Sequence, residues 1–173
     1  EHNVYNARGA AAAARSLGAP EQRVIEGLES LALVPGRLEP VEAGQKFRVL
    51  VDYAHTDSAL EAVVRYLGRL PHRRLTTVFG CGGDRDAGKR GPMGIAAAAG
   101  SDFVYVTSDN PRSEDPHLIL SEIEAGIKSS GRKNYKIIPE REEAIQEAIR
   151  EAQEGDVVLI AGKGHETTQT FAD

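Results

Sequence analysis

Short apolar runs alternate with segments of helical periodicity along most of the chain. The apolar runs read as strands at 47–51, 75–79, 103–106, 135–138 and 157–160. Between them, apolar residues recur at three- and four-residue spacing, as in Ala144, Ala148 and Ile149, which is typical of amphipathic helices. This alternation predicts an α/β fold: a Rossmann-like, mostly parallel sheet with helices on both faces and right-handed crossovers.

A helical segment is expected before the sheet begins. An alanine-rich stretch predicts a helix over 3–17, ended by Gly18 and Pro20, and a second helix follows at about 21–31. Pro35 and Gly36 then break the pattern, so we place a domain boundary there. The prediction is a short helical segment at 1–35 followed by an α/β domain at 36–173. Residues 168–171 are interpreted as one further strand.

The composition limits the partners and the compartment. The 173 residues carry a net charge of -5 and no basic stripe, which argues against a nucleic-acid partner. Cys81 is the single cysteine, so no intrachain disulfide can form, and a lone thiol favours the cytoplasm. No apolar stretch approaches the length of a membrane span, and no signal peptide is visible. The chain opens on Glu1 rather than Met, so we expect it to be part of a longer protein.

Polar loops follow four of the expected strands. They comprise residues 52–56, 80–86, 107–116 and 162–166. Ligands of open α/β sheets bind outside the carboxyl ends of the strands. Four such loops leaving one edge therefore predict a single ligand crevice, although each loop could simply be solvated.

The loop from Asp109 to Arg112 is the most specific of these four. Arg112 can hold a carboxylate through two parallel hydrogen bonds, and Asp109 can accept from an ammonium group. An amino acid carries both groups, so this pair indicates an amino-acid ligand. Arg85 could bind a second carboxylate or form an ordinary surface salt bridge.

Two glycine-rich segments resemble nucleotide-binding motifs but do not satisfy them. Residues 80–85 follow G-x-G-x-x-R and lack the third glycine of a dinucleotide fingerprint. In the phosphate-loop motif Ser or Thr follows the lysine, whereas here Lys163 precedes Gly164. The sequence therefore lacks the usual contacts to nucleotide β- and γ-phosphates.

The remaining candidates at the strand ends have structural alternatives. Asp52 could cap the next helix, although Thr56 or Asp57 lies closer to its start. His55 could be a surface histidine, and Tyr53 could either pack or stack on a base. A thiol nucleophile at Cys81 is disfavoured, because a small residue at a strand exit is explained by packing.

Taken together, the motifs resemble the Mur ligases over nearly the whole chain. The matching segments are Asn3-x-x-Asn6, Gly36-Arg37-Leu38-Glu39, Asp52-Tyr53-Ala54-His55-Thr56, Gly80-Cys81-Gly82-Gly83-Asp84-Arg85-Asp86, Asp109-Asn110-Pro111-Arg112 and Gly162-Lys163-Gly164-His165-Glu166. One position departs from the family pattern, since Asp57 replaces a proline. That substitution changes the stiffness of the loop but removes no expected contact.

The resemblance implies a three-domain enzyme of peptidoglycan synthesis. Residues 1–35 would be the end of its central ATPase domain, and 36–173 its C-terminal Rossmann-like domain. The N-terminal domain, the phosphate loop and the Mg²⁺ ligands would lie outside this chain. The implied reaction uses ATP to phosphorylate a substrate carboxylate, which the amine of meso-diaminopimelate then attacks.

The resemblance also implies roles for individual residues. It places meso-diaminopimelate at Arg85, Asp109, Asn110, Pro111, Arg112, Gly162 and Glu166. It places ATP at Asn3, Asn6, Arg37, Asp52, Tyr53 and His55. The UDP-N-acetylmuramoyl dipeptide would be the other substrate, and this chain would contribute no metal ligand and no assigned catalytic residue.

Two alternatives of different kinds remain open. The chain could come from a lysine-adding or folylpolyglutamate-type ligase of the same superfamily, although Arg112 argues against lysine because lysine lacks the second carboxylate. It could also be an amino-acid-binding or regulatory module without catalysis.

Overall fold

The computed structural model describes residues 2–31 and 33–172 and divides the chain into two compact units, Glu1–Val34 and Pro35–Asp173. The first unit is a pair of helices, α1 (His2–Ser16) and α2 (Glu21–Glu29). Gly18, at φ 88°, ends α1 in the left-handed conformation common after helices. An ion pair of 2.7 Å between Arg15 and Glu21 joins the helices. No residue of α2 is buried, so this pair has little apolar core of its own.

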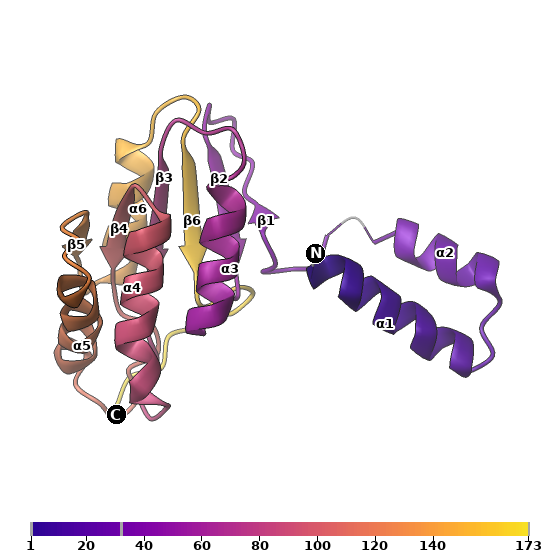
Figure 1. Cartoon of the computed structure of the whole chain (residues 1–173), viewed down its shortest axis with the longest axis horizontal. Coiled ribbons are helices and arrows are strands. Elements are labelled where there is room, and N and C mark those ends of the chain that lie inside the picture. The colour runs from indigo at the N-terminus through magenta and orange to yellow at the C-terminus, as the bar shows by residue number, and fades with distance from the viewer. Residues whose placement is uncertain (1, 32, 173) are drawn as a thin grey trace. The chain divides into compact units, whose positions relative to one another are not determined.

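The second unit is built on a six-stranded sheet (Figure 1). Its strands are β1 (Glu39–Pro40), β2 (Arg48–Asp52), β3 (Leu75–Phe79), β4 (Phe103–Val106), β5 (Tyr135–Ile137) and β6 (Val157–Ala161). Their order is β1-β2-β6-β3-β4-β5. All neighbours are parallel except the short β1, which pairs antiparallel with β2. The last strand therefore lies between β2 and β3.

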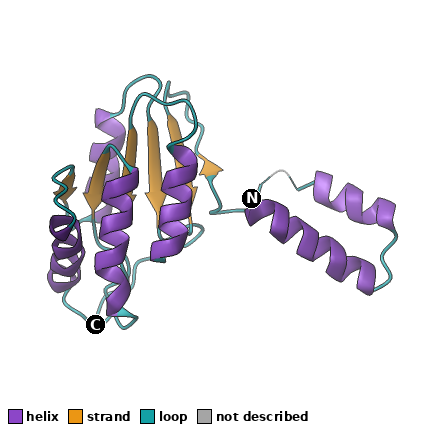
Figure 2. Cartoon of the chain, viewed as in Figure 1, coloured by secondary structure: helices purple, strands orange, loops and turns teal. Residues whose placement is uncertain are grey.

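Helices cover both faces of this sheet. They are α3 (Asp57–Leu67), α4 (Arg90–Gly100), α5 (Pro116–Ser129) and α6 (Arg141–Glu151), with a short 3-10 helix, η1, at Ala87–Lys89. Figures 1 and 2 show α3, α4 and α5 on one face and α6 on the other. The expected α/β sheet with helices on both faces is confirmed.

The core follows the two-residue periodicity of the strands. Phe79 packs in the cluster beneath α3, α4 and α5, whereas the adjacent Val78 packs in the cluster beneath α6. The same alternation separates Val104 from Tyr105 in β4. Because both faces are covered, every residue of β3 is buried, as expected of a central parallel strand.

Local sequence signals fix where the helices begin. The Thr56 hydroxyl accepts a hydrogen bond from the backbone N–H of Ala59 and caps α3, so Asp52 is not the capping residue. Asp115 caps α5, with Pro116 in its first turn. Between α4 and α5, a side chain at Gly126 would meet the backbone of Gly91, so glycine permits this close crossing.

The structure differs from the sequence prediction at two places near the ends of the α/β unit. Residues 168–171 do not form a strand in the described chain; they contribute one bridge, in which the Arg112 N–H donates to the Thr170 carbonyl at 3.0 Å. This segment is polar and mostly exposed, so it lacks the apolar face that would hold a strand in the sheet. The two-residue β1 was not predicted, because two residues carry no detectable periodicity.

Candidate ligand site at the strand ends

Four loops meet at the carboxyl edge of the parallel strands, in the order set by the sheet. The loop after β6 lies between the loops of β2 and β3, and the loop of β4 follows. Hydrogen bonds join them: the Gly162 N–H donates to the Asp52 carbonyl, and the Gly83 N–H donates to the Asn110 carbonyl. The sheet topology therefore gathers loops that lie far apart in the sequence.

The centre of this edge is a polar group, the Asn110 cluster, in which Asn110 and Lys163 are buried and Glu166 is exposed. The Asn110 amide nitrogen donates to Glu166 Oε2 at 2.9 Å, and Asn110 Oδ1 accepts from Lys163 Nζ at 2.8 Å and from the Thr170 N–H at 2.9 Å. Lys163 also pairs with Glu166 at 2.9 Å. Hydrogen bonding from Lys163 lowers the pKa of Glu166, so its carboxylate is held ionised.

Asp109 lies beside this cluster, against the β6 loop. One carboxylate oxygen accepts from the Asn110 N–H at 2.7 Å. A side chain on Gly162 would come within 3.1 Å of the other oxygen, and Gly162 has a φ of 108°. Glycine is required there for both the backbone conformation and the close approach.

Arg112 is held with part of its guanidinium committed to the protein. Its Nη1 donates to the carbonyls of Gly83 at 2.7 Å and Asn110 at 3.3 Å. Among the described residues, Nε and Nη2 have no hydrogen-bond partner, which leaves one edge of the fork for a carboxylate. The backbone of Arg112 is left-handed, at φ 53°, and the predicted residue before it, Pro111, is buried.

The structure does not bring Arg85 to this group. Its side chain is exposed, and its Nη1 donates to the carbonyl of the adjacent Asp84 at 3.0 Å. Asp84 itself is fixed in a left-handed conformation, φ 51°, by hydrogen bonds from Ser113. The loop is therefore ordered while the arginine extends from it, and the contact with the ligand stays a prediction.

Two buried arginines that the sequence analysis did not select hold these loops through hydrogen bonds. Arg90 is 1% exposed; it holds Glu114 by both carboxylate oxygens and Glu122 at 2.7 Å. The hydrogen bonds from Arg90 lower the pKa of Glu114. Arg141 is also buried and donates to the carbonyls of Ser108 and Ala161. No sequence signal distinguishes these two arginines from the exposed arginines of the chain.

At the other side of the β6 loop, four side chains form the Tyr53 cluster: Arg37, Tyr53, His55 and His165. The Arg37 guanidinium lies 5.0 Å from the centre of the Tyr53 ring, and the His55 and His165 rings lie 4.6 and 5.6 Å away. The two histidines and Arg37 are exposed. Such a set of rings and a cation can stack on a purine base. His165 was not among the predicted site residues.

Asp52 is used by the protein itself. It is 6% exposed; one carboxylate oxygen accepts from the Leu38 N–H and the other from the Ala54 N–H, both at 2.8 Å. These bonds orient the segments that carry Arg37 and Tyr53. The predicted nucleotide contact of Asp52 stays a prediction.

The two predicted asparagines belong to the helical unit. Asn6 is exposed on α1, and the side chain of Asn3 lies outside the described residues. Their assignment to ATP stays a prediction.

Cys81 is buried beside Met93, with 3.6 Å between the two sulfurs. Burial raises the pKa of this thiol to about 12. A thiolate nucleophile is therefore excluded at neutral pH, and Cys81 acts as a packing residue.

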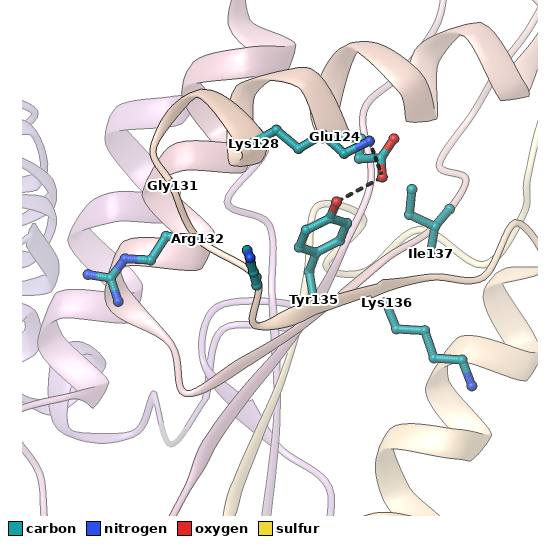
Figure 3. Close-up of a pocket in the computed structure, with 8 residues that line it drawn as sticks. Glu124, Lys128, Gly131, Arg132, Tyr135, Lys136 and Ile137 are labelled. Atoms are coloured by element: carbon teal, nitrogen blue, oxygen red, sulfur yellow. Dashed lines mark hydrogen bonds and ion pairs between the residues drawn. The ribbon is translucent and has the colours of Figure 1, made fainter.

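A hollow of about 600 Å³ lies away from these loops, where α5 ends and β5 begins (Figure 3). Its cationic side chains are partly paired: Lys128 binds Glu124 at 2.9 Å, and Lys136 binds Glu147 of α6 at 2.7 Å. Figure 3 shows Arg132 and Lys136 pointing in different directions rather than toward a shared point. None of the residues lining this hollow is a predicted site residue.

The described residues contain no cluster of three or more His, Cys, Asp or Glu side chains able to hold a metal ion. Within the same part of the chain, no helix is both long and apolar enough to cross a membrane. The strand ends of this α/β unit thus carry two adjacent groups of side chains, the Asn110 cluster and the Tyr53 cluster.

Comparison with known proteins identifies the family. Residues 36–164 match the family model "Mur ligase, glutamate ligase domain", and the chain belongs to the Mur ligase family. A UDP-N-acetylmuramoyl-L-alanyl-D-glutamate–2,6-diaminopimelate ligase of Solibacter usitatus (strain Ellin6076) is 53% identical over 171 residues, covering 99% of this chain and 34% of that protein. The enzyme of the same name from Geobacillus thermodenitrificans (strain NG80-2) is 51% identical, with 99% and 35% covered.

Solved structures agree with the family assignment. A structure of a UDP-N-acetylmuramoyl-L-alanyl-D-glutamate–2,6-diaminopimelate ligase superposes with a TM-score of 0.73 at 43% identity, over 98% of this chain and 34% of that one. FolC of E. coli in complex with ADP superposes with a TM-score of 0.70 at 27% identity, over 92% and 36%. The chain spans about a third of the relatives it matches.

Proposed function

We propose that this chain is the amino-acid-binding and nucleotide-covering part of an ATP-dependent ligase. The enzyme would add meso-diaminopimelate to UDP-N-acetylmuramoyl-L-alanyl-D-glutamate in cytoplasmic peptidoglycan synthesis, supporting cell shape and division. Residues 1–35 would end its central ATPase domain, and 36–173 would form its C-terminal domain. The names of the relatives that are 53% and 51% identical support this choice over a folylpolyglutamate-type enzyme.

The proposal rests on the hydrogen bonding of the Arg112 side chain. Two backbone carbonyls hold its Nη1, its Nε and Nη2 have no hydrogen-bond partner among the described residues, and its charge helps to lower the pKa of Glu166. A ligand that carries both carboxylate and ammonium groups complements this arrangement. Meso-diaminopimelate has a carboxylate at the end of its side chain, whereas lysine has none and would leave the guanidinium unpaired.

The Tyr53 cluster would cover the nucleotide. Arg37, Tyr53 and His55 provide rings and a cation suited to the adenine, and Asp52 fixes their backbone. When bound, ATP supplies the phosphoryl group that activates the substrate carboxylate, with Mg²⁺ managing the charge. The Mg²⁺ ligands and the phosphate-binding loop would be supplied by other parts of the enzyme. Closure of the domains would bring the two subsites together over the reacting groups.

The test compares Arg112→Ala and Arg112→Lys with the wild-type full-length ligase, using meso-diaminopimelate and lysine as substrates. We expect Arg112→Ala to lower kcat/KM for meso-diaminopimelate by about 10²–10³-fold, with a change below about threefold for lysine. Arg112→Lys should recover little, because an ammonium lacks the planar fork. The matched control is Arg132→Ala, which changes an exposed arginine away from the site. An unchanged preference in Arg112→Ala would contradict the assignment.

The 173-residue chain allows a second test. We expect it to bind meso-diaminopimelate weakly and to catalyse no ligation, because the phosphate-binding loop is absent from its sequence. Calorimetry and a phosphate-release assay measure the two properties. Ligation by this chain alone would refute the proposed division of labour, and a full-length protein without ATP-dependent ligation would favour a non-catalytic module.

A further inference from the structure

The first residue of α6, Arg141, is a buried arginine without an ion-pair partner among the described residues. It is 6% exposed. Its Nη2 donates to the Ala161 carbonyl at 2.9 Å, and its Nη1 donates to the Ser108 carbonyl at 3.4 Å. Both bonds go to uncharged acceptors, although a buried cation is normally compensated by a nearby carboxylate.

Its position in the helix is also unfavourable. The N-terminus of a helix carries a partial positive charge, which repels a cation. Glu142 and Glu143 follow directly and suit that end of α6 far better. Burial disfavours the charged form as well and lowers the pKa of Arg141. The stability of α6 therefore does not explain an arginine at its first position, and the contacts of the guanidinium lie outside the helix.

The two acceptors lie at the exits of two different strands. Ser108 directly precedes Asp109 after β4, and Ala161 ends β6 directly before Gly162. Between these strands lies β3, which is followed by Gly80. A side chain at Gly80 would come within 3.0 Å of the Asp109 nitrogen, so glycine lets the loops close over the end of β3. Arg141 thus joins, from the α6 face, the two loops that carry the amino-acid subsite.

The charges that act on Arg141 come from the same subsite. Asp109 and Glu166 are the two carboxylates whose attraction partly offsets the effect of burial on this residue. They belong to the β4 and β6 loops respectively, and neither forms an ion pair with Arg141. The guanidinium is therefore a buried positive charge near enough to attract both carboxylates.

We propose that Arg141 is a positioning residue of the amino-acid subsite. It ties the ends of β4 and β6 together across β3, and it places a buried positive charge behind Asp109 and Glu166. Both carboxylates are then held, at a fixed separation, to receive the ammonium groups of a diamino acid. This inference rests on the proposed function, because it concerns the site assigned there to meso-diaminopimelate.

The experiment measures KM and kcat of the full-length ligase for each substrate in Arg141→Met and Arg141→Lys. We expect Arg141→Met to raise KM for meso-diaminopimelate by at least about tenfold, with KM for ATP changed less than about threefold. Arg141→Lys keeps the charge but cannot reach both carbonyls as a fork, so its rise should be smaller, about three- to fivefold. Arg150→Met, at an exposed arginine of the same helix, is the matched control.

Comparing the change in KM for meso-diaminopimelate with the change in KM for ATP distinguishes a positioning role from a purely stabilising one. A structural role alone would lower the melting temperature and the active fraction while leaving KM for meso-diaminopimelate at its wild-type value. If Arg141→Met does not fold, Arg141→Lys decides the question. An unchanged KM for meso-diaminopimelate in the folded variant, or an equal rise in KM for ATP, would overturn the inference. Failure of the proposed function is distinguishable, because the wild-type enzyme would then not use meso-diaminopimelate.

Discussion

The Asn110 cluster and the Tyr53 cluster lie on either side of the same β6 loop. They differ in how far their side chains are buried and hydrogen-bonded within the protein. Asn110 and Lys163 are 7% and 8% exposed and use their polar atoms on one another and on neighbouring backbone. Arg37, His55 and His165 are exposed and contact the protein mainly through the Tyr53 ring. The first cluster is preorganised, whereas the second offers surfaces that a ligand can complete.

The β6 loop connects the two clusters through glycines. Gly162 allows the approach of Asp109, and a side chain on Gly164 would come within 2.8 Å of Tyr53 Cβ. The loop backbone is thus packed against Asp109 on one side and against Tyr53 on the other. Under the proposed function, we expect specificity to reside in the Asn110 cluster, because desolvated polar groups penalise a mismatched ligand most strongly.

The largest effect should come from breaking the Asn110 cluster at its centre with Asn110→Leu. The variant removes three hydrogen bonds and leaves the Thr170 N–H and one Lys163 contact without an acceptor. We expect the free energy of unfolding of this chain to fall by about 2–4 kcal/mol. Binding of meso-diaminopimelate should be lost at the same time. Urea unfolding and calorimetry of the 173-residue chain measure the two changes.

A matched variant distinguishes the site from general stability. The Asn134 amide nitrogen donates to the Ser101 carbonyl at 2.9 Å and to the Ala98 carbonyl at 3.2 Å, at the opposite end of the sheet. Asn134→Leu should therefore destabilise the chain similarly without affecting amino-acid binding. Equal losses of binding in both variants would show that the Asn110 cluster has no special relation to the ligand.

The sequence predicted the features that depend on local interactions better than those that depend on contacts between distant residues. Apolar alternation located β3 and β4 correctly because strand and helix signals are local. The gathering of four loops was predictable from a topological rule of parallel sheets. The short β1 was missed, and the segment 168–171 was wrongly predicted to be a strand, because the state of both depends on neighbours rather than on local pattern.

The buried polar contacts were beyond sequence reasoning for a related reason. Lys163 meets Asn110 across 53 positions, and Arg141 reaches Ala161 across 20. Charged residues are usually exposed, so neither residue type predicts burial. Arg85 is exposed in the structure, and its predicted contact with the ligand stays a prediction. Residue type predicts a ligand chemistry, whereas the tertiary structure determines which groups are preorganised.

An intermediate effect is expected from removing the cation of the Asn110 cluster with Lys163→Met. Hydrogen bonding from Lys163 lowers the folded-state pKa of Glu166, so this pair stabilises the fold above the unfolded pKa of the carboxyl group. That stabilisation disappears as pH falls through the folded-state pKa. We expect a loss of about 1–2 kcal/mol at pH 7 that shrinks progressively from about pH 5 to pH 3.

Unfolding of wild type and Lys163→Met at pH 7, 5 and 3 measures this difference. Lys128→Met is the matched control, because Lys128 forms an exposed pair with Glu124 on α5. That pair should contribute less than about 0.5 kcal/mol. A Lys163→Met effect that does not change with pH would contradict the role of Glu166 as the partner.

The smallest effect is expected on the nucleotide side, from Tyr53→Leu in the full-length ligase. Loss of the ring removes the platform shared by Arg37, His55 and His165. Stacking of one base on an aromatic ring supports a rise in KM for ATP of about five- to tenfold, with stability changed by less than about 1 kcal/mol. Tyr53→Phe keeps the ring and should resemble wild type. KM for meso-diaminopimelate should stay constant in both variants, since the Asn110 cluster is held by its own hydrogen bonds. A matching rise in that constant would show that the β6 loop transmits changes between the clusters, and that the two subsites form one unit.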